Sequence, residues 1–429
     1  MNSPKSKTFC SYVIPSILAF ALSGVYTIVD GFFVGRSLGD IGLASITLGF
    51  PVSALIQAIG TGIGLSGAIR FTILGAQNET NKQQSCFSGT ILLMISTGVL
   101  LTALLFGLAD PMLRLLGAKN EALALAAEYV RIIALGALFQ LLATGFVPFI
   151  RNMGGASFAM VAMILGFVTN VVLDYAFVWA LPWGMAGAAW ATVMGQAVTM
   201  IAAIIFFAVK KCRMIFQPPA ELFGLWRGIL RVSLSPFGLT FSPTVTLLLM
   251  NRFLLIYGDE QSVAIYGCIS YITSIIYLLL QGIGDGCQPL ISRYYGERNA
   301  SDLRQTRRTA YLTALGVSGI CMILVFLVRT KVGILFGASE SSNAGVVTYL
   351  PYFLATMLFL AFVRITTSYF YATEKTTLSY ILVYAEPICT LALLSLLPLV
   401  FKLEGVWLAV PLAQMIAFVI AVIGKRHVE

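Results

Sequence analysis

Histidine is almost missing from this chain of 429 residues, since the only one is His427, near the C-terminus. A histidine proton relay and a histidine-based metal site are therefore both excluded. Charged residues are scarce too, at 10% of the chain, against about a quarter in ordinary soluble domains. The seven cysteines are odd in number and contain no C-x-x-C pair, which excludes a disulfide framework.

What the chain has instead is apolar sequence. Hydrophobic residues make up 59% of it, in runs that are repeatedly longer than the roughly 20 residues that cross a bilayer as a helix. The sequence therefore predicts an all-α membrane protein with twelve transmembrane helices. The predicted spans are residues 11–35, 43–70, 86–108, 127–149, 158–181, 186–209, 232–257, 262–292, 308–328, 346–371, 379–400 and 405–424.

The basic residues predict how these spans are oriented. With the N-terminus inside, the inner segments carry most of the lysines and arginines, among them KKCR at 210–213 and five arginines between Arg293 and Arg308. The positive-inside rule then places both termini in the cytoplasm of a multi-pass protein of the plasma (cell inner) membrane. Topology and contact with the lipid bilayer account for the net charge of +9, so no nucleic-acid partner is expected.

Motifs that recur half a chain apart indicate an internal repeat. QAIGTG at 57–62 returns as QGIGDG at 281–286, and each is followed by a polar stretch, LGAQNETNKQQ at 74–84 and YGERNASDLRQ at 295–305. With six spans in each half, both halves start on the cytoplasmic side and form parallel bundles related by a pseudo-two-fold axis along the membrane normal. The predicted parts are an N-terminal six-helix bundle over 1–209, a cytoplasmic linker over 210–231 and a C-terminal six-helix bundle over 232–429.

Two carboxylates are predicted to lie inside the first half. Asp30, in VYTIVDGFFVGRSLG of the first span, and Asp174 of the fifth each lie about six residues before an outer end, hence at one depth. Asn170 shares the helix face of Asp174, and Thr192 of the sixth span reaches the same level. Two carboxylates out of water cannot both stay ionised cheaply, so this set predicts a site that holds a proton or binds a cation such as Na⁺. The alternative is that the two acids only hydrogen-bond neighbouring helices.

A second polar set is predicted in the other half, at a common depth nearer the inner side. It consists of Asp285 of the eighth span, Arg364 of the tenth and Glu386 of the eleventh. Opposite charges at one depth indicate an ion pair that faces a cavity. Substrate binding and a structural pair that closes the inner side both explain this set, and the sequence does not choose between them.

The motifs around the first set resemble the multidrug and toxic compound extrusion (MATE) family of transporters. YTIVDGFFVGRSLG is similar to that family's first-span pattern, and TNVVLDYAF with GMAGAAWATVMGQ resembles its fifth and sixth spans. The resemblance covers nearly the whole chain and implies the prokaryotic branch with acids in the first and fifth spans, where Asn170, Asp174 and Thr192 match the cation-site network. Pro15 matches the proline at which the first helix of some members bends. The seventh span has no acid, so the C-terminal cation site of other branches is not transferred.

The resemblance implies a proton-coupled or Na⁺-coupled antiporter that exports amphipathic, often cationic, organic compounds by alternating access. We expect it to need no cofactor and to be a monomer. The runner-up is a lipid-linked saccharide flippase of the same superfamily, for which a more cationic central cavity is expected. A membrane-embedded enzyme would need a nucleophile, metal ligands or a catalytic base grouped at one interface. The sequence shows no such group, so we predict a transporter rather than an enzyme, with no metal site beyond Na⁺ binding at Asp30 and Asp174.

Overall fold

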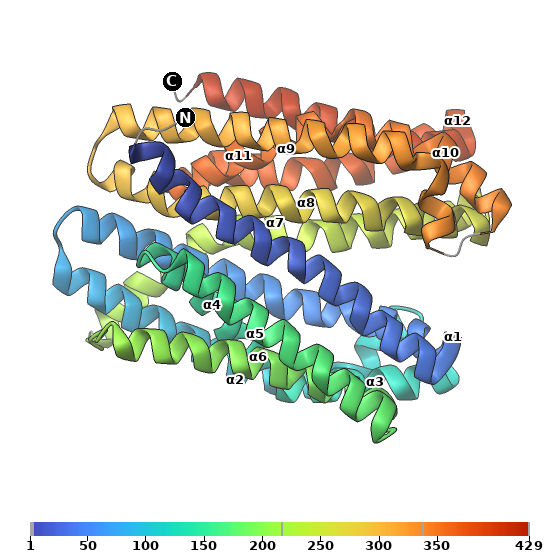
Figure 1. The fold of residues 1–429 in the computed structure, drawn as a ribbon, viewed down its shortest axis with the longest axis horizontal. Helices are drawn as coiled ribbons and strands as arrows, with labels where there is room; N and C mark the ends of the chain where they lie inside the picture. Colours follow the sequence, from blue (N-terminus) through green and yellow to red (C-terminus); the bar gives the residue numbers. More distant parts are fainter. Residues whose placement is uncertain (1–3, 216–217, 337–338, 428–429) are drawn as a thin grey trace. The chain divides into compact units, whose positions relative to one another are not determined.

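The computed structural model describes residues 4–215, 218–336 and 339–427, and every regular element in these ranges is a helix (Figure 1). Lipid offers no partner to backbone N–H and C=O groups, and a helix satisfies them within one segment, which is why long apolar runs fold this way. The helices are α1 (Pro4–Ala76), α2 (Thr80–Leu115), α3 (Asn120–Leu135), α4 (Ala137–Asn152), α5 (Ala156–Asp174), the π-helix η1 (Tyr175–Ala180), α6 (Gly184–Val209), α7 (Pro219–Tyr257), α8 (Glu260–Gly296), α9 (Ala300–Leu335), α10 (Glu340–Ala355), α11 (Met357–Ala372) and α12 (Thr376–Arg426).

Most of these helices are long and apolar enough to cross a membrane. In the described part of the chain, 9 helical stretches meet that condition, and two further pairs of short helices meet it when each pair is taken together. α1 supplies two of the stretches, Ser6–Val25 and Ile41–Ala76. Its helix breaks at Gly39, whose φ of 63° and ψ of −154° are conformations that glycine adopts readily. The prediction of a multi-pass membrane protein is thus confirmed.

The number of spans depends on α12. Its 51 residues measure about 75 Å at 1.5 Å per residue, roughly twice the length needed to cross a bilayer. The backbone leaves the helical region at Lys402, with φ 51° and ψ −129°, between the predicted spans 379–400 and 405–424. When α12 counts as two spans and each bent pair as one, the described residues give twelve, and that number stays a prediction.

Two of the predicted spans, 127–149 and 346–371, are each built from two short helices. α3 and α4 meet at 57° around Gly136, and α10 and α11 meet at 42° around Thr356. A side-chain carbon at Gly136 would collide with the Val193 side chain, so glycine lets this bend approach α6 closely. The bends were not predicted, because the apolar pattern continues through both of them.

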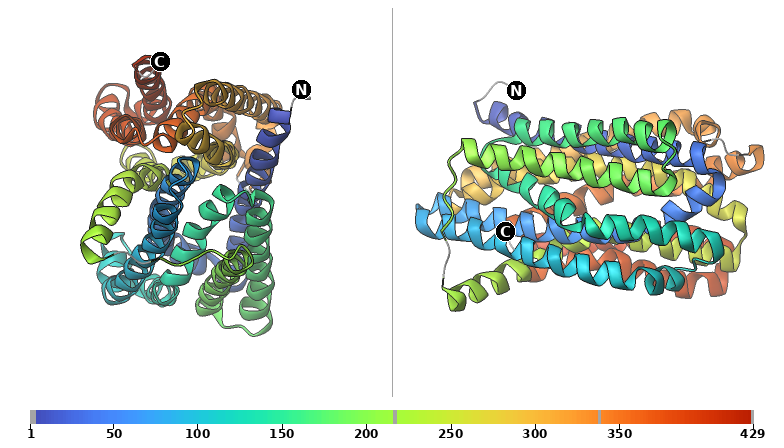
Figure 2. Two further views of the ribbon diagram at one scale, coloured as in Figure 1. Left: turned by 90° about the vertical axis from the view of Figure 1, so that its left-hand side faces the viewer. Right: turned by 90° about the horizontal axis from the view of Figure 1, so that it is seen from below.

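Contacts between helices divide the chain into two compact units. Unit 1 is the chain up to Thr240 with Ser292–Asn299, and unit 2 is Phe241–Ile291 with the chain from Ala300 onward. Inside each unit the helices run side by side as a bundle (Figure 2). The second part of the predicted linker is helical, since α7 begins at Pro219.

The two halves of the chain repeat their backbone turns at one spacing. Asn78 and Arg298 have positive φ, 63° and 55°, in turns with the same three backbone hydrogen bonds. Gly154 and Glu374, with φ of 85° and 54°, form a second pair of turns with that pattern. Asn78 and Arg298 are as far apart in the sequence as Gly154 and Glu374 are. The bends at Gly136 and Thr356 have the same separation. This regularity supports the internal repeat.

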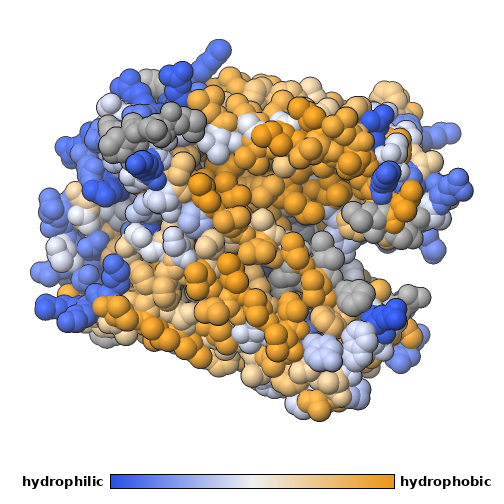
Figure 3. Space-filling view, in the orientation of Figure 1, coloured by the Kyte–Doolittle hydropathy of each residue, from blue (hydrophilic) through white to orange (hydrophobic). Residues whose placement is uncertain are grey.

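Apolar side chains cover the sides of the helices on the face seen in Figure 3, while hydrophilic side chains gather near helix ends. Leu327 of α9 and Val400 of α12, for example, are 69% and 74% exposed. Contiguous apolar surface of this extent is unfavourable in water and suits contact with lipid chains. The surface therefore agrees with the membrane location that the helix lengths indicate.

Asp259, immediately before α8, caps that helix. Its carboxylate accepts hydrogen bonds of 2.8 Å from both the backbone N–H and the hydroxyl of Ser262, and these bonds lower the pKa of Asp259. A lowered carboxylate pKa adds stability above the unfolded-state pKa of about 3.9, and this stability is lost as pH falls through the folded pKa. We therefore expect Asp259→Ala to melt at a lower temperature than the parent protein at neutral pH, with a smaller difference in acid, where the carboxyl is protonated.

The melting midpoint of the detergent-solubilised protein, measured at neutral pH and near pH 3, checks this expectation. Asp259→Asn is the matched control, because asparagine caps a helix without a charge, so its midpoint at neutral pH should lie between those of the alanine variant and the parent protein. An alanine variant that melts with the parent protein at neutral pH would contradict a stabilising cap.

Candidate functional site

α5 and α6 bring polar residues of the first predicted set together inside unit 1. Asn170 and Asp174 lie one turn apart on α5, and Thr192 lies on α6, which packs against it. All three are buried, with 2%, 0% and 6% of their surfaces exposed. The side-chain amide of Asn170 donates a hydrogen bond of 3.4 Å to the Thr192 hydroxyl. The two helices therefore meet through these side chains.

A close crossing of α5 and α6 explains why these side chains meet. A carbon added at Gly166 would lie 2.8 Å from the Gly195 carbonyl oxygen, and one added at Gly195 would lie 2.7 Å from the Gly166 carbonyl oxygen. Small residues let membrane helices approach this closely. Thr199 lies at the same crossing, and its hydroxyl donates to the carbonyl oxygens of Ala162 and Gly195 at 3.3 Å and 3.2 Å. The polar set lies one turn beyond this crossing.

The α-helix changes to a π-helix directly after Asp174. Within η1 the hydrogen bonds span five residues, as shown by the Leu181 N–H, which donates to the Ala176 carbonyl oxygen at 2.9 Å. π-turns are rare and occur frequently at functional sites. The sequence does not predict this feature, because the residue pattern of η1 is that of an ordinary apolar helix. Asp174 consequently lies at the boundary between two helical registers.

Asp30 belongs to α1, and its side chain lies outside the described residues. The part of α1 that follows it contacts η1. The ring of Phe33 lies 6.2 Å from that of Trp179, and the Ser37 hydroxyl donates a hydrogen bond of 3.2 Å to the Val178 carbonyl oxygen. The backbone of α1 therefore passes beside the end of α5 within one turn of Asp30.

The buried set supplies oxygen atoms of the kind that a cation site needs. The side-chain oxygen Oδ1 of Asn170 is buried and accepts no hydrogen bond from the residues that the structure describes. The Asp174 carboxylate, one turn away, is completely buried in a membrane-spanning helix, where a charge is costly. A proton on the carboxylate, or a Na⁺ ion held by the carboxylate and neutral oxygens, removes that cost.

Each member of the second predicted set has a hydrogen-bond partner inside unit 2. Arg364 of α11 is 2% exposed. Its guanidinium donates a hydrogen bond of 2.7 Å to the Tyr277 hydroxyl of α8 and lies 4.3 Å from the centre of that ring. Asp285, two turns further along α8, is 6% exposed and accepts a hydrogen bond of 3.2 Å from the Tyr371 hydroxyl. A tyrosine hydroxyl thus forms a hydrogen bond with each of these two charged groups.

Glu386 of α12 is held by a second pair of polar residues. The side-chain amide of Gln414 donates to its carboxylate at 3.1 Å, and the Thr356 hydroxyl donates to the Gln414 amide oxygen at 2.5 Å. The tyrosine and glutamine partners of these charged residues were not predicted from the sequence. Polar side chains inside apolar spans were the available indication, but tyrosine is common in membrane helices and does not stand out.

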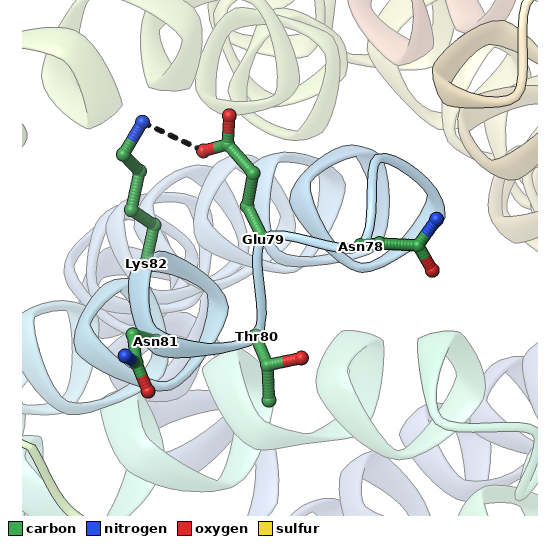
Figure 4. Close-up of a pocket in the computed structure, with 5 residues that line it drawn as sticks. All are labelled: Asn78, Glu79, Thr80, Asn81 and Lys82. Carbon is green, nitrogen blue, oxygen red and sulfur yellow. Dashed lines mark ion pairs between the residues drawn. The ribbon is translucent and has the colours of Figure 1, made fainter.

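A surface pocket lies at the turn between α1 and α2 (Figure 4). Five consecutive residues line it: Asn78, Glu79, Thr80, Asn81 and Lys82. Glu79 and Lys82 form an ion pair of 2.8 Å, with 38% and 68% of their side chains exposed, so water screens the pair and it contributes little. The described residues that line the pocket come only from this turn and the start of α2, whereas binding sites usually draw on several elements.

The repeat and the helical architecture agree with comparisons to known proteins. The family model described as MatE matches residues 15–176 and 237–394, two segments of similar length that together make up most of the chain. "Multidrug export protein MepA" of Staphylococcus saprophyticus is 25% identical over 366 residues, which cover 82% of this chain and 78% of that protein. The protein of the same name from Staphylococcus aureus is 24% identical over 336 residues, which cover 76% of this chain and 72% of that protein.

A solved structure, described as a crystal structure of MATE in complex with MaL6, superposes with a TM-score of 0.91. The two sequences are 25% identical, and the match covers 99% of this chain and 96% of that chain. The fold and the family match together show that this chain is a membrane transporter rather than an enzyme. It belongs to the MatE family.

Proposed function

We propose that the protein is a cation-coupled antiporter that exports amphipathic, often cationic, organic compounds by alternating access, with H⁺ or Na⁺ as the coupling ion. The observation that carries the proposal is the completely buried Asp174 beside the bonded pair of Asn170 and Thr192. Membership of the MatE family and similarity to proteins named multidrug export protein support the export of organic compounds.

In this proposal Asp30 and Asp174 hold the coupling cation, and Asn170 and Thr192 serve as neutral ligands. The course of α1 beside η1 supports the inclusion of Asp30, because it brings that part of the first span to the end of α5. The set corresponds to the prokaryotic branch with acids in the first and fifth spans.

The energy available from one ion is sufficient for efflux. A monovalent ion that moves down 100 mV releases about 2.3 kcal/mol, which sustains roughly a 50-fold substrate gradient per net charge moved. Coupling requires that the carboxylates change their proton or ion occupancy during the cycle and that the site opens to each side in turn. A buried site at the end of a bundle of helices meets the requirement for a change of occupancy, because the charge of a buried carboxylate depends strongly on the proton or ion that it binds.

Dye transport into inverted vesicles tests the proposed function. A panel of cationic dyes should accumulate in the lumen when the lumen holds the higher concentration of either H⁺ or Na⁺, with each gradient imposed separately. Vesicles without the protein provide the background. Dye movement that ignores both gradients would exclude cation coupling, and the gradient that drives accumulation identifies the ion.

The proposed topology has twelve spans in two parallel six-helix bundles, 1–209 and 232–429, joined by a cytoplasmic linker over 210–231. An even number of spans in each half requires both termini on the same side of the membrane. We expect reporters fused to the two ends of a monomeric protein in the plasma (cell inner) membrane to read cytoplasmic. A reporter that reads outside at either end would contradict the parallel arrangement.

Pro15 is buried within α1, fifteen residues before Asp30. Proline supplies no N–H to the helix, and we propose that the missing hydrogen bond lets the first span bend when the charge of Asp30 changes. Pro15→Ala is therefore expected to insert normally but to transport poorly, because alanine restores the hydrogen bond and stiffens the helix.

Expression and dye efflux measured on the same vesicles check the role of Pro15. Pro111, an exposed proline inside α2, gives the matched control, and Pro111→Ala should transport like the parent protein. Parent-like efflux by Pro15→Ala would show that the proline is incidental to transport.

A further inference from the structure

Three basic side chains of unit 2 lie on the faces of aromatic rings at one end of its helices. The Arg307 guanidinium of α9 lies 4.8 Å from the centre of the Tyr369 ring of α11, and the ammonium of Lys375, immediately before α12, lies 5.8 Å from the same centre. The Lys425 ammonium, at the end of α12, lies 5.1 Å from the centre of the Tyr311 ring of α9. We call these five residues the basic platform.

Direct contacts join the two rings of the basic platform. The Tyr311 and Thr366 hydroxyls share a hydrogen bond of 2.7 Å, and Thr366 lies one turn before Tyr369 on α11. The end of α12 also packs here, since a carbon added at Gly424, the residue before the platform lysine of α12, would lie 3.6 Å from the Phe370 ring of α11. Helices α9, α11 and α12 therefore meet at the basic platform.

Arg307 and Lys375 are held close together although they carry the same charge. Because both lie over the Tyr369 ring, the guanidinium and the ammonium are no further apart than the sum of their distances from its centre. A ring face attracts a cation without cancelling its charge, and like charges at this separation repel each other. Burial and the nearby Arg307 guanidinium both lower the pKa of Lys375. An anion bound beside the two cations would remove their repulsion.

The fold does not require charges at this position. At the repeat spacing that relates the paired backbone turns of the two halves of the chain, Arg307 corresponds to Phe87 of unit 1 and Tyr369 corresponds to Phe149. The rings of Phe87 and Phe149 lie 5.2 Å apart and are 1% and 0% exposed, so unit 1 makes the same contact with two apolar rings. The basic platform is therefore specific to unit 2 and needs a reason beyond helix packing.

Apolar surface suited to lipid chains adjoins the basic platform. Leu312, next to Tyr311 on α9, is 63% exposed, and Ile423, two residues before Lys425 on α12, is 51% exposed. The proposed topology places this end of unit 2 on the cytoplasmic side, where the lipid leaflet carries anionic headgroups. A phospholipid bound here places its phosphate on the cations and its acyl chains along the two helices, whereas a free phosphate ion would leave the apolar surface unused.

We propose that the basic platform binds the headgroup phosphate of an anionic phospholipid. Lys375 and Lys425, which are partly exposed, contact the headgroup oxygens, and the buried Arg307 adds positive charge beside them. The aromatic rings hold the cations in place before the lipid binds. Basic pockets between membrane helices on the cytoplasmic side bind anionic headgroups in this way. This inference goes beyond the proposed function and is tested without a transport assay.

Lipid binding to the full-length protein, purified in detergent, tests the proposal. Phosphatidylglycerol added in mixed micelles should raise the melting midpoint of the parent protein, since a ligand that binds the folded state stabilises it, and the dependence on lipid concentration gives the affinity. Phosphatidylcholine, whose headgroup has no net charge, should leave the midpoint unchanged. Lys375→Gln combined with Lys425→Gln should weaken phosphatidylglycerol binding at least about tenfold, because two ammonium charges are lost.

Arg308→Gln combined with Arg426→Gln is the matched control. Both arginines are exposed, each next to a residue of the basic platform, and the variant loses the same net charge as the lysine variant. Its affinity for phosphatidylglycerol should stay within about twofold of that of the parent protein, because exposed charges are screened by salt. A control variant that loses as much affinity as the lysine variant would show that net charge alone attracts the lipid, and the proposal would then be wrong.

Two further outcomes would overturn the proposal. The first is a parent protein that phosphatidylcholine stabilises as well as phosphatidylglycerol does, because the headgroup charge would then have no part in binding. The second is sodium phosphate that stabilises the parent protein as well as phosphatidylglycerol does, relative to sodium chloride at matched ionic strength. That result would identify a site for free phosphate rather than for a lipid.

A second variant covers the case in which the lysine variant does not fold. Arg307→Phe combined with Tyr369→Phe installs the pair of rings that unit 1 packs at the corresponding positions, so it should fold and melt near the parent protein or above it in lipid-free detergent. It removes the buried guanidinium and should therefore weaken phosphatidylglycerol binding at least about fivefold. A phenylalanine variant that binds this lipid as tightly as the parent protein does would overturn the proposal.

Discussion

Asp174→Asn and Asp30→Asn are each expected to reach the membrane at near-normal levels and to abolish gradient-driven efflux. Removing a buried charge lowers the cost of insertion, which is about 2.5–3.5 kcal/mol for an aspartate at the centre of a membrane helix. The same change removes the group whose proton or ion occupancy converts the gradient into work. Transport should therefore fall to the level of vesicles without the protein, although the protein is present.

The neutral members of the set should matter less. Asn170→Ala and Thr192→Ala each remove one partner of a single hydrogen bond of 3.4 Å and leave the Asp174 carboxylate in place. Neutral oxygens contribute less than a charge to cation binding. We expect these variants to weaken coupling without abolishing it, as a higher ion concentration needed for half-maximal efflux.

Expression and efflux measured on the same vesicles separate this reading from a purely structural role for the two acids. If they only join helices, Asp174→Asn should fold poorly, while the surviving molecules remain coupled. Asp110→Asn is the matched control, because Asp110 is 44% exposed and pairs with Arg131 outside the buried set. Asp30→Asn protein that still concentrates dye against its gradient would contradict the assignment of the coupling site.

The sequence was most informative where periodicity and depth act together. Asn170 and Asp174 were placed on one face of a helix by their spacing of four, and the count from the span ends brought Thr192 to their level. The structure buries all three and bonds two of them. The π-turn after Asp174 could not be foreseen, because a change of helical register depends on tertiary contacts rather than on the types of residue involved.

Features of the fold and of the second predicted set that depend on tertiary contacts were also not predicted. Long apolar runs indicated membrane helices, but the bends at Gly136 and Thr356 interrupt runs that are uniformly apolar. The repeat was visible from short motifs, yet the backbone turns pair at a spacing about one helical turn shorter than that of QAIGTG and QGIGDG. In unit 2 the charges of Asp285, Arg364 and Glu386 stood out, whereas their tyrosine and glutamine partners did not.

Gly195→Ala should impair transport by at least about tenfold, although the change adds only one carbon atom. That carbon would lie 2.7 Å from the Gly166 carbonyl oxygen and 3.0 Å from the Cβ of Asn170. A backbone atom cannot move aside as a flexible side chain does, so α5 must shift away from α6. Overpacking of this kind typically costs about 1–3 kcal/mol. The shift also separates Asn170 from Thr192, whose hydrogen bond of 3.4 Å is already long.

Efflux normalised to the amount of folded protein, together with the melting midpoint, measures both consequences of Gly195→Ala. Gly316→Ala of α9 is the matched control, because a carbon added there meets nothing within 4 Å. It should transport like the parent protein and melt at the same or a slightly higher temperature, since alanine favours the helix over glycine. Gly195→Ala with parent-like efflux per folded molecule would mean that the site tolerates a displaced α5. The close crossing of α5 and α6 would then be a feature of packing alone, without a part in holding the coupling ion.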